Sequence, residues 1–126
     1  MYISIMTYGK ESIIIKFCEE KKTDEMISKY SDIDSCIITS EFNTFFNNGF
    51  NEYFKSNIKM SDEQISMFRN LILKFIKINS LFLTNKISLY EYINELASLR
   101  KKWNEKYPYY NIVIFNDSSI RIDYMK

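Results

Sequence analysis

The stretch MSDEQISMFRNLILKFIKINSLFLTNKISLYEY, residues 60–92, decides the fold of this chain. It contains two helix-start signatures, in which a serine is followed three positions later by Gln or Glu: Ser61 with Gln64, and Ser88 with Glu91. This spacing is typical of a capping box, in which the two residues satisfy each other's free backbone N–H groups. The flanking apolar pairs, where a hydrophobic staple would form, are Met60 with Ile65 and Ile87 with Tyr92. The stretch therefore predicts two helices joined by a short turn, a helical hairpin.

The two helices of this hairpin differ in their patterns. The helix after Ser61 is apolar on most sides, so we expect it to be the central and most buried helix. The second helix is expected to carry on one face Leu89, Tyr92, Ile93, Leu96, Leu99 and Trp103. Its expected end bears Arg100, Lys101 and Lys102, which suit the partial negative charge of a helix C-terminus. Pro108 then forbids continuation.

An earlier aromatic stripe predicts a further helix over residues 41–57. Its aromatic residues recur at three- and four-residue spacings, as expected of a helix laid on a core: Phe42, Phe45, Phe46, Phe50, Tyr53 and Phe54. Gly49 and five asparagines lower the helix propensity of this segment, so packing has to hold it.

Residues rich in β-branched and aromatic types lie at both ends of the chain. They predict an N-terminal hairpin of strands 2–7 and 12–17 and a C-terminal hairpin of strands 112–115 and 120–124. In the last strand, apolar and charged residues alternate, which places Asp123 on the solvent-exposed face. Between the hairpins, Thr23 or Asp24 could cap a short helix with Met26, Ile27 and Tyr30, and a brief strand could follow at Ser35 to Thr39.

These elements together predict a single α+β domain over residues 1–126. We expect an antiparallel sheet, formed by the N- and C-terminal β-hairpins, that packs against three or four central helices. Ten Phe, ten Tyr and one Trp predict a core rich in aromatic rings.

Charge is unevenly distributed along the chain, although the net charge is only +1. Residues 19–41 carry seven acids and three lysines, a local balance of −4, whereas residues 100–126 carry six bases and three acids, a balance of +3. The small net charge argues against a phosphate backbone as the main partner. A charged stretch usually forms a solvated face, and this interpretation of the acidic stretch stands beside any functional one.

Histidine is absent, which removes the commonest general base, the commonest zinc ligand and every triad built on imidazole. Cys18 and Cys36 lie in apolar runs where a buried thiol is the ordinary occupant, and they are too few for a zinc site without carboxylate ligands. Neither glycine lies in a phosphate-binding loop. The carboxylate pairs Asp32 with Asp34 and Glu19 with Glu20 are interpreted as surface groups. We therefore expect no catalytic residue, no cofactor and no metal, and a protein that is not an enzyme.

The N-terminal residues lack the basic start and small-residue cleavage site of a secretory signal. No apolar run approaches the roughly 20 residues of a membrane span, because the richest stretch, residues 65–83, is interrupted by Arg69, Lys74 and Lys77. We therefore expect a cytoplasmic protein that does not bind membranes.

The basic cluster Arg100, Lys101 and Lys102 follows two helices and a short turn, which invites comparison with a helix-turn-helix. In that motif the base-reading residues lie near the start of the second helix. Here this start is Leu89 to Tyr92, with one acid and three large apolar side chains. We therefore interpret the cluster as helix capping and expect no direct nucleic-acid binding. A nucleic-acid-associated regulator or antitoxin is the alternative function.

The segment SLFLTNKISLYEYINELASLRKKW, Ser80 to Trp103, resembles a stretch of bacterial self-protective immunity proteins of the colicin D type. The residues that carry this resemblance are Phe82, Leu83, Lys86, Ile87, Ser88 and Tyr92. The resemblance implies an immunity protein of a bacteriocin or contact-dependent growth inhibition system. Such a protein binds a cognate toxin, here expected to be a nuclease with a basic active-site cleft, and occludes its active site.

An inhibitor of a basic nuclease needs an acidic surface with aromatic anchors, because opposite charge speeds encounter and buried rings hold the complex. The acidic stretch and nearby tyrosines, expected to be exposed, match this need. The candidate partner-binding residues are Asp24, Glu25, Tyr30, Asp32, Asp34, Glu41 and Tyr53. A structural protein of a phage or mobile element, with a large apolar self-interface, is a further alternative.

Overall fold

The computed structural model of this protein describes residues 1–8, 12–18, 35–115 and 118–125. The elements within these residues are β1 (Tyr2–Tyr8), β2 (Ser12–Cys18), β3 (Ser35–Glu41), α2 (Phe42–Asn48), α3 (Phe50–Asn57), α4 (Asp62–Leu83), α5 (Leu89–Lys106), β4 (Tyr110–Phe115) and β5 (Ser119–Tyr124). The short helix expected after Thr23 or Asp24, with Met26, Ile27 and Tyr30, lies outside the described residues.

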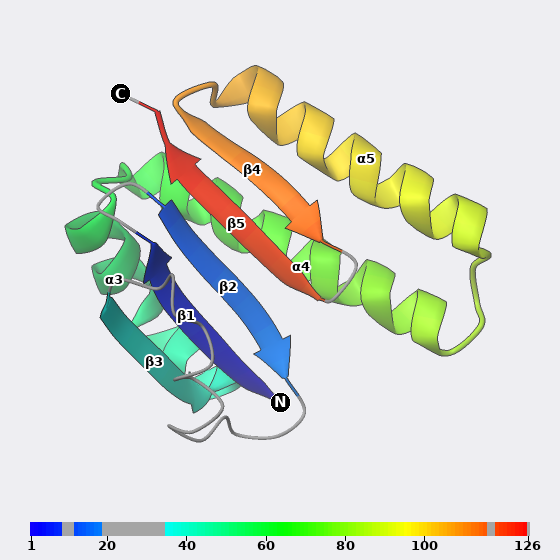
Figure 1. Ribbon diagram of the computed structural model, residues 1–126, viewed down its shortest axis with the longest axis horizontal. Coiled ribbons are helices and arrows are strands. Elements are labelled where there is room, and N and C mark those ends of the chain that lie inside the picture. The colour runs from blue at the N-terminus through cyan, green and yellow to red at the C-terminus, as the bar shows by residue number, and fades with distance from the viewer. Residues whose placement is uncertain (9–11, 19–34, 116–117, 126) are drawn as a thin grey trace.

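The described strands form one antiparallel sheet in the order β3-β1-β2-β5-β4 (Figure 1). The prediction that the two terminal hairpins share a sheet is confirmed, because β2 pairs with β5, with Ile13 opposite Ile122 and Ile15 opposite Ile120. The strand expected from Ser35 is also present, and it extends to Glu41 beside β1. Both ends of the described chain therefore contribute strands to one layer.

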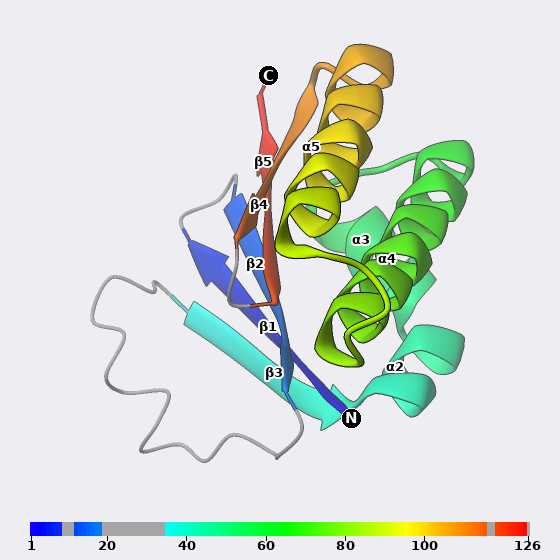
Figure 2. The same ribbon diagram turned by 90° about the vertical axis from the view of Figure 1, so that its right-hand side faces the viewer.

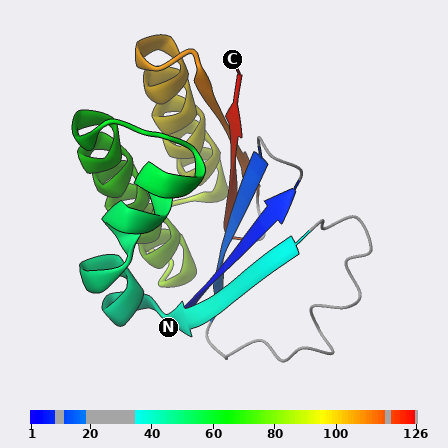
Figure 3. The same cartoon turned by 90° about the vertical axis from the view of Figure 1, so that its left-hand side faces the viewer.

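The described helices all lie on one face of this sheet (Figures 2 and 3). The residues that point toward them alternate along the strands and are at most 2% exposed: Ile3, Ile5, Ile13, Ile15, Ile112, Ile120 and Ile122. The predicted α+β fold, with an antiparallel sheet packed against central helices, is confirmed.

Aromatic rings fill the centre of the core, as the composition predicts. The ring centroids of Phe50 and Phe54 are 4.6 Å apart, those of Phe54 and Phe68 are 5.3 Å apart, and those of Phe68 and Trp103 are 5.4 Å apart. All four side chains are at most 5% exposed. Since each buried ring removes about 150–250 Å² from water, this cluster joins α3, α4 and α5 into one core.

Helix α4 contributes more buried side chains to this core than any other described helix, which agrees with its predicted central position. They are Ile65, Phe68, Leu71, Ile72, Phe75 and Ile78. Its outer side is nevertheless open, because Leu73 is 48% exposed. The helix is therefore amphipathic rather than buried all round.

The single helix expected over residues 41–57 is wrong, because the structure has two helices separated by Gly49. The N–H of Gly49 donates to the carbonyl oxygen of Phe45 at 2.8 Å, and the N–H of Tyr53 donates to the carbonyl oxygen of Gly49 at 3.0 Å. A Cβ at Gly49 would lie 3.2 Å from a ring carbon of Phe45. The buried aromatic stripe continues across this bend, so its spacing alone does not reveal the break.

Both predicted capping boxes are present. The N–H of Gln64 donates to Ser61 Oγ at 3.2 Å, and the N–H of Ser61 donates to Gln64 Oε1 at 2.8 Å. In the second box the N–H of Glu91 donates to Ser88 Oγ at 3.1 Å, and the N–H of Ser88 donates to Glu91 Oε1 at 3.3 Å. These bonds fix where the two long helices begin.

The face of the sheet opposite the helices carries a polar group around Asp123. Its carboxylate accepts a hydrogen bond from Ser12 Oγ at 2.7 Å and pairs with Arg121 Nε at 3.1 Å. The Asp123 side chain is only 21% exposed, so it is more buried than the strand alternation predicts. Cys18 is half-buried with a free thiol, a partial departure from the expected buried position, and the Cys36 side chain lies outside the described set.

None of the described helices combines the length and the apolar character that crossing a membrane requires.

Candidate protein-binding surface on the helical hairpin

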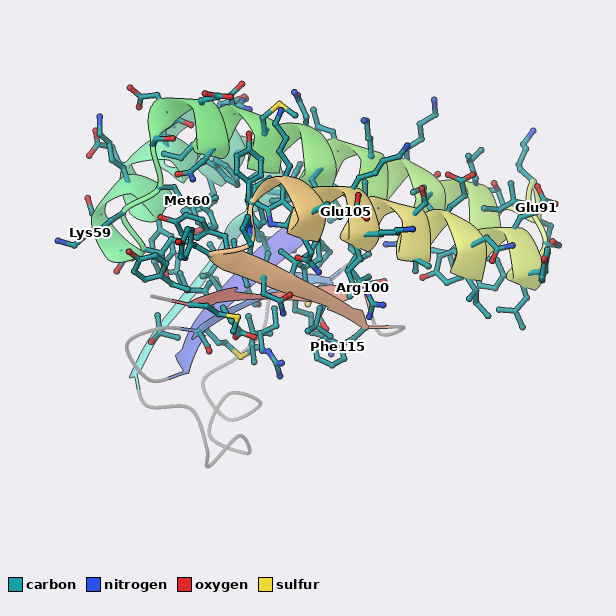
Figure 4. All side chains as sticks on the ribbon, turned by 90° about the horizontal axis from the view of Figure 1, so that it is seen from above. Lys59, Met60, Glu91, Arg100, Glu105 and Phe115 are labelled. Carbon is teal, nitrogen blue, oxygen red and sulfur yellow. The ribbon has the colours of Figure 1, made fainter. Side chains whose placement is uncertain are left out.

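The α4–α5 hairpin extends past the edge of the sheet. Figure 4 shows Glu105 above the sheet, whereas Glu91 lies at the far end of the hairpin, away from the strands. Asn104 is bonded to Ile112 in β4, which fixes the last turns of α5 to the sheet. The first turns of α5 and the last turn of α4 therefore form a projecting end.

Large apolar side chains are exposed at this projecting end, which we call the hairpin tip and define as Leu83, Leu89, Tyr90 and Ile93. Their exposed fractions are 75%, 60%, 76% and 52%. The prediction that Leu89 and Ile93 lie on the buried face of α5 is therefore wrong. On that helix the buried side chains are Tyr92, Leu96 and Trp103. The tip lies beyond the strands, so the sheet does not cover these residues.

The hairpin tip is held rigidly by local contacts. The rings of Phe82 and Tyr92 stack with centroids 4.3 Å apart and an interplanar angle of 15°. The Tyr92 hydroxyl donates to Asn79 Oδ1 at 2.7 Å, and burial raises the pKa of that hydroxyl. In the turn, the Lys86 N–H donates to the carbonyl oxygen of Leu81 at 2.8 Å, while Asn85 has φ 59°, a left-handed conformation that asparagine tolerates.

A furrow runs between the two helices of the hairpin. It consists of two adjoining hollows of about 430 and 170 Å³, which share Lys74, Leu99 and Lys102. The larger hollow extends toward the tip as far as Ile87 and Glu91. The smaller one reaches Trp103, Lys106 and Tyr107 at the other end of α5.

The basic cluster predicted to end the second helix lies within it instead. Helix α5 continues to Lys106, which is the basic residue of its last turn, so Arg100, Lys101 and Lys102 precede that turn. All three are exposed, and Lys102 lines both hollows of the furrow. Interaction with the helix C-terminus is therefore not their main role.

The predicted acidic binding face is described only at two of its seven positions. Asp24, Glu25, Tyr30, Asp32 and Asp34 lie outside the described residues, as do the carboxylates Glu19 and Glu20. The two described positions are Glu41, at the start of α2, and Tyr53, in α3.

The two described members of the predicted face have structural contacts. The Glu41 carboxylate is exposed and caps α2, accepting from the N–H of Thr44 at 2.9 Å and from its hydroxyl at 3.2 Å. The hydrogen bond from the Thr44 backbone holds the pKa of Glu41 below its ordinary value. Tyr53 is half-buried rather than exposed, because its ring packs edge-on against Phe45 and Phe54 at 6.0 and 5.3 Å. Tyr53 therefore offers a partner only part of its ring.

Metal-binding geometry is not found in the described part of the chain: there, no three Cys, Asp or Glu side chains come close enough to hold an ion. The polar group Ser12, Asp123 and Arg121 is internally satisfied, and the guanidinium of Arg121 lies 5.9 Å from the centroid of the Phe115 ring. These contacts explain the three side chains as parts of the sheet.

Comparisons of this chain with known protein families, with curated proteins and with solved structures find no match. On the described surface, the hairpin tip gathers four large exposed apolar side chains beside the furrow.

Proposed function

We propose that this protein is an immunity protein, a stoichiometric inhibitor that binds a cognate toxin and occludes its active site. The observation that carries the proposal is the hairpin tip, where four large apolar side chains are 52–76% exposed. Exposed apolar patches on a folded protein mark sites of interaction with other molecules. The tip also lies within Ser80 to Trp103, the segment that resembles immunity proteins.

The tip is suited to binding because it is ordered before a partner arrives. Two capping boxes and the stacked pair Phe82 and Tyr92 hold the backbone on both sides of the turn. A preorganised surface loses little conformational entropy on association. Burying the exposed parts of Leu89 and Ile93 would contribute roughly 1–1.5 kcal/mol each, about half of what full burial of such a side chain gives. Tyr90 belongs to a residue type enriched among the residues that dominate interface energies.

The predicted acidic face supplies the second part of the proposal. Asp24, Glu25, Asp32, Asp34 and Glu41 would attract a basic nuclease cleft over long range, and Tyr30 and Tyr53 would contribute ring contacts. In this scheme acidic residues raise the rate of encounter and the tip slows dissociation. Inhibition by occlusion needs no catalytic group on the inhibitor, which suits a chain without histidine.

The proposal is tested by co-expression with the toxin domain encoded in the adjacent reading frame. We expect a 1:1 complex by calorimetry and loss of the toxin's activity at equimolar inhibitor. The double variant Leu89→Ser with Tyr90→Ser should weaken the complex by about 100-fold, since each 1.4 kcal/mol lost is a factor of ten.

The matched control is Tyr109→Ser, because Tyr109 is 65% exposed but follows the opposite end of α5. This variant should change affinity by less than about threefold, a shift of under about 0.7 kcal/mol. Equal affinities for the two variants would refute the role of the tip. An adjacent reading frame whose product forms no complex with the wild-type chain would refute the immunity function itself.

A second candidate, a nucleic-acid-associated regulator or antitoxin, is favoured by the exposed bases of α5. Arg100, Lys101, Lys102 and Lys106 are all exposed within two turns of that helix. Such a protein should bind duplex DNA with an affinity that falls steeply between 50 and 200 mM salt, on the order of a factor of ten or more for each few phosphates contacted. The double variant Lys101→Glu with Lys102→Glu should abolish this binding, and unchanged affinity would exclude the candidate.

A further inference from the structure

The furrow between α4 and α5 has an apolar floor and charged rims. Its α4 side runs from Met67 to Leu81, which is about 21 Å at about 1.5 Å per residue. Buried or half-buried apolar side chains form its floor, among them Leu71, Leu99 and Trp103. An apolar floor of four helical turns matches the footprint of another helix.

The charges along the furrow are arranged unevenly. The half near the end of α5 is lined by three exposed lysines, Lys74, Lys102 and Lys106, and by no acid. Lys77, Glu91 and Glu95 line the half near the tip. The Glu91 carboxylate is already engaged in the capping box of α5.

The furrow lysines are available to a partner. Among the described residues, the ion pairs join Lys55 with Asp62 and Arg121 with Asp123, so none uses a lysine of the furrow. Lys106 Nζ lies 5.5 Å from the centroid of the Tyr107 ring, which keeps the ammonium beside the aromatic floor. Four lysines (Lys74, Lys77, Lys102 and Lys106) against two acids (Glu91 and Glu95) line the apolar floor, and this balance favours a ligand that is both apolar and negatively charged.

We propose that this furrow binds an amphipathic helix of a partner protein, with an apolar stripe flanked by acidic residues. The apolar stripe would cover Leu71, Leu99 and Trp103, and the acids would lie between Lys74 and Lys102. A helix in this position would pack over α4 and α5 and contact both. The apolar floor favours such a helix over a nucleic-acid strand, because a phosphate backbone would bury no apolar surface against Leu71, Leu99 and Trp103. The residues of this site differ from those of the tip and of the predicted acidic face, which we propose to bind a basic toxin.

The test uses the intrinsic fluorescence of the protein. Trp103 is the one tryptophan of the chain, and it lines the furrow, so its emission reports occupancy directly. The probe is a synthetic 18-residue helical peptide without Trp or Tyr, with leucines at i, i+3, i+4 and i+7 and glutamates beside them. We expect a saturable change in Trp103 emission, and a matched peptide with lysine in place of each glutamate should give none.

The charge dependence is measured on variants. Lys74→Glu with Lys102→Glu and Lys106→Glu should weaken binding of the acidic peptide at least tenfold. The control, Lys86→Glu with Arg100→Glu and Lys101→Glu, makes the same change of charge outside the furrow and should bind within twofold of wild type. Circular dichroism and urea midpoints check that each variant is folded, and Lys74→Gln with Lys102→Gln replaces the triple variant if it is not.

Several outcomes would overturn the proposal. They are the absence of any emission change with the acidic peptide, equal binding of the lysine peptide, and unchanged binding by the triple variant. Tighter Trp103-detected binding of a duplex or single-stranded oligonucleotide would assign the furrow to nucleic acid. A concentration-dependent Trp103 shift without peptide would assign it to a second copy. None of these outcomes depends on whether a toxin binds the tip, so the two proposals fail separately.

Discussion

The side-chain amide of Asn104 in α5 forms two hydrogen bonds with the main chain of Ile112 in β4. Its Oδ1 accepts from the Ile112 N–H at 2.8 Å, and its Nδ2 donates to the Ile112 carbonyl oxygen at 3.2 Å. One residue earlier in the helix, Trp103 Nε1 donates to the carbonyl oxygen of Tyr110 at 2.6 Å. Because β4 is an outer strand of the sheet, these bonds occupy backbone groups that would otherwise be open to another strand.

Replacing Asn104 should therefore destabilise the fold. Asn104→Ala removes both bonds and leaves the N–H and carbonyl of Ile112 without their partner, which should lower the free energy of unfolding by about 1–3 kcal/mol. Urea denaturation measures this loss. Asn94→Ala is the control, because Asn94 is exposed on the same helix and the change in helix propensity is the same. Equal stabilities of the two variants would show that the Asn104 bonds contribute nothing.

The two serine caps should stabilise the fold by similar amounts, and each contribution can be measured on its own variant. Ser61→Ala and Ser88→Ala each remove the acceptor of a capping box, and each should lower the free energy of unfolding by about 1 kcal/mol. Ser66→Ala, at an exposed position inside α4, should have no such cost, since alanine favours a helix interior. A Ser66 variant as unstable as the cap variants would contradict this assignment.

The tip should lose rigidity without Tyr92's hydrogen bond. Tyr92→Phe keeps the ring stacked on Phe82 but deletes the bond to Asn79 Oδ1, which should cost about 0.5–1.5 kcal/mol. Amide hydrogen exchange at residues 82–92 should accelerate. Tyr90→Phe changes the same group at a 76% exposed position and should leave both measurements unchanged. Identical exchange in the two variants would argue that the bond has no structural role.

Glu41 should make stability depend on pH. Hydrogen bonds to the Glu41 carboxylate, of which that from the Thr44 backbone N–H has the largest effect, hold the folded-state pKa of Glu41 below the ordinary value of 4.5. A lowered folded pKa means that the contribution is present above pH 4.5 and is lost as pH falls through the folded pKa. Glu41→Gln should therefore shift the urea midpoint at pH 7 more than at pH 3. Glu95→Gln, at an exposed position in α5, controls for loss of one negative charge.

Features set by local sequence could be predicted, whereas those set by distant contacts could not. The capping boxes depend on residues three positions apart, and both were identifiable from spacing alone. The exposure of Leu89 and Ile93 depends on where the sheet stops beneath α5, which no helical periodicity encodes. The partial enclosure of Asp123 depends on Ser12, which is 111 positions away in sequence.

The candidate site was harder to predict from the sequence than the helix starts, because it too depends on contacts between distant residues. The acidic stretch pointed to a charged face, but of its described members Glu41 caps a helix and Tyr53 packs against phenylalanines. The furrow combines side chains from α4 and α5, and it becomes visible only when the two helices lie side by side. The sequence signal available for the furrow was a pair of lysines on each helix. Lys74 and Lys77 are three residues apart on α4, and Lys102 and Lys106 are four residues apart on α5.

The position of β5 between β2 and β4 constrains how the chain can acquire its structure during synthesis. β5 follows the other described strands in the sequence but fills an interior place, so β2 lacks its second neighbour until residues 119–124 emerge, although β1 can already pair with β3. Until then the outer edge of β2 has no partner strand. Pairing of β2 with β5 requires closure of a long loop, and such long-range contacts slow folding. A nascent chain of this protein is therefore a candidate for chaperone binding, and the bond from Ser12 to Asp123 can form only at the end of translation of this segment.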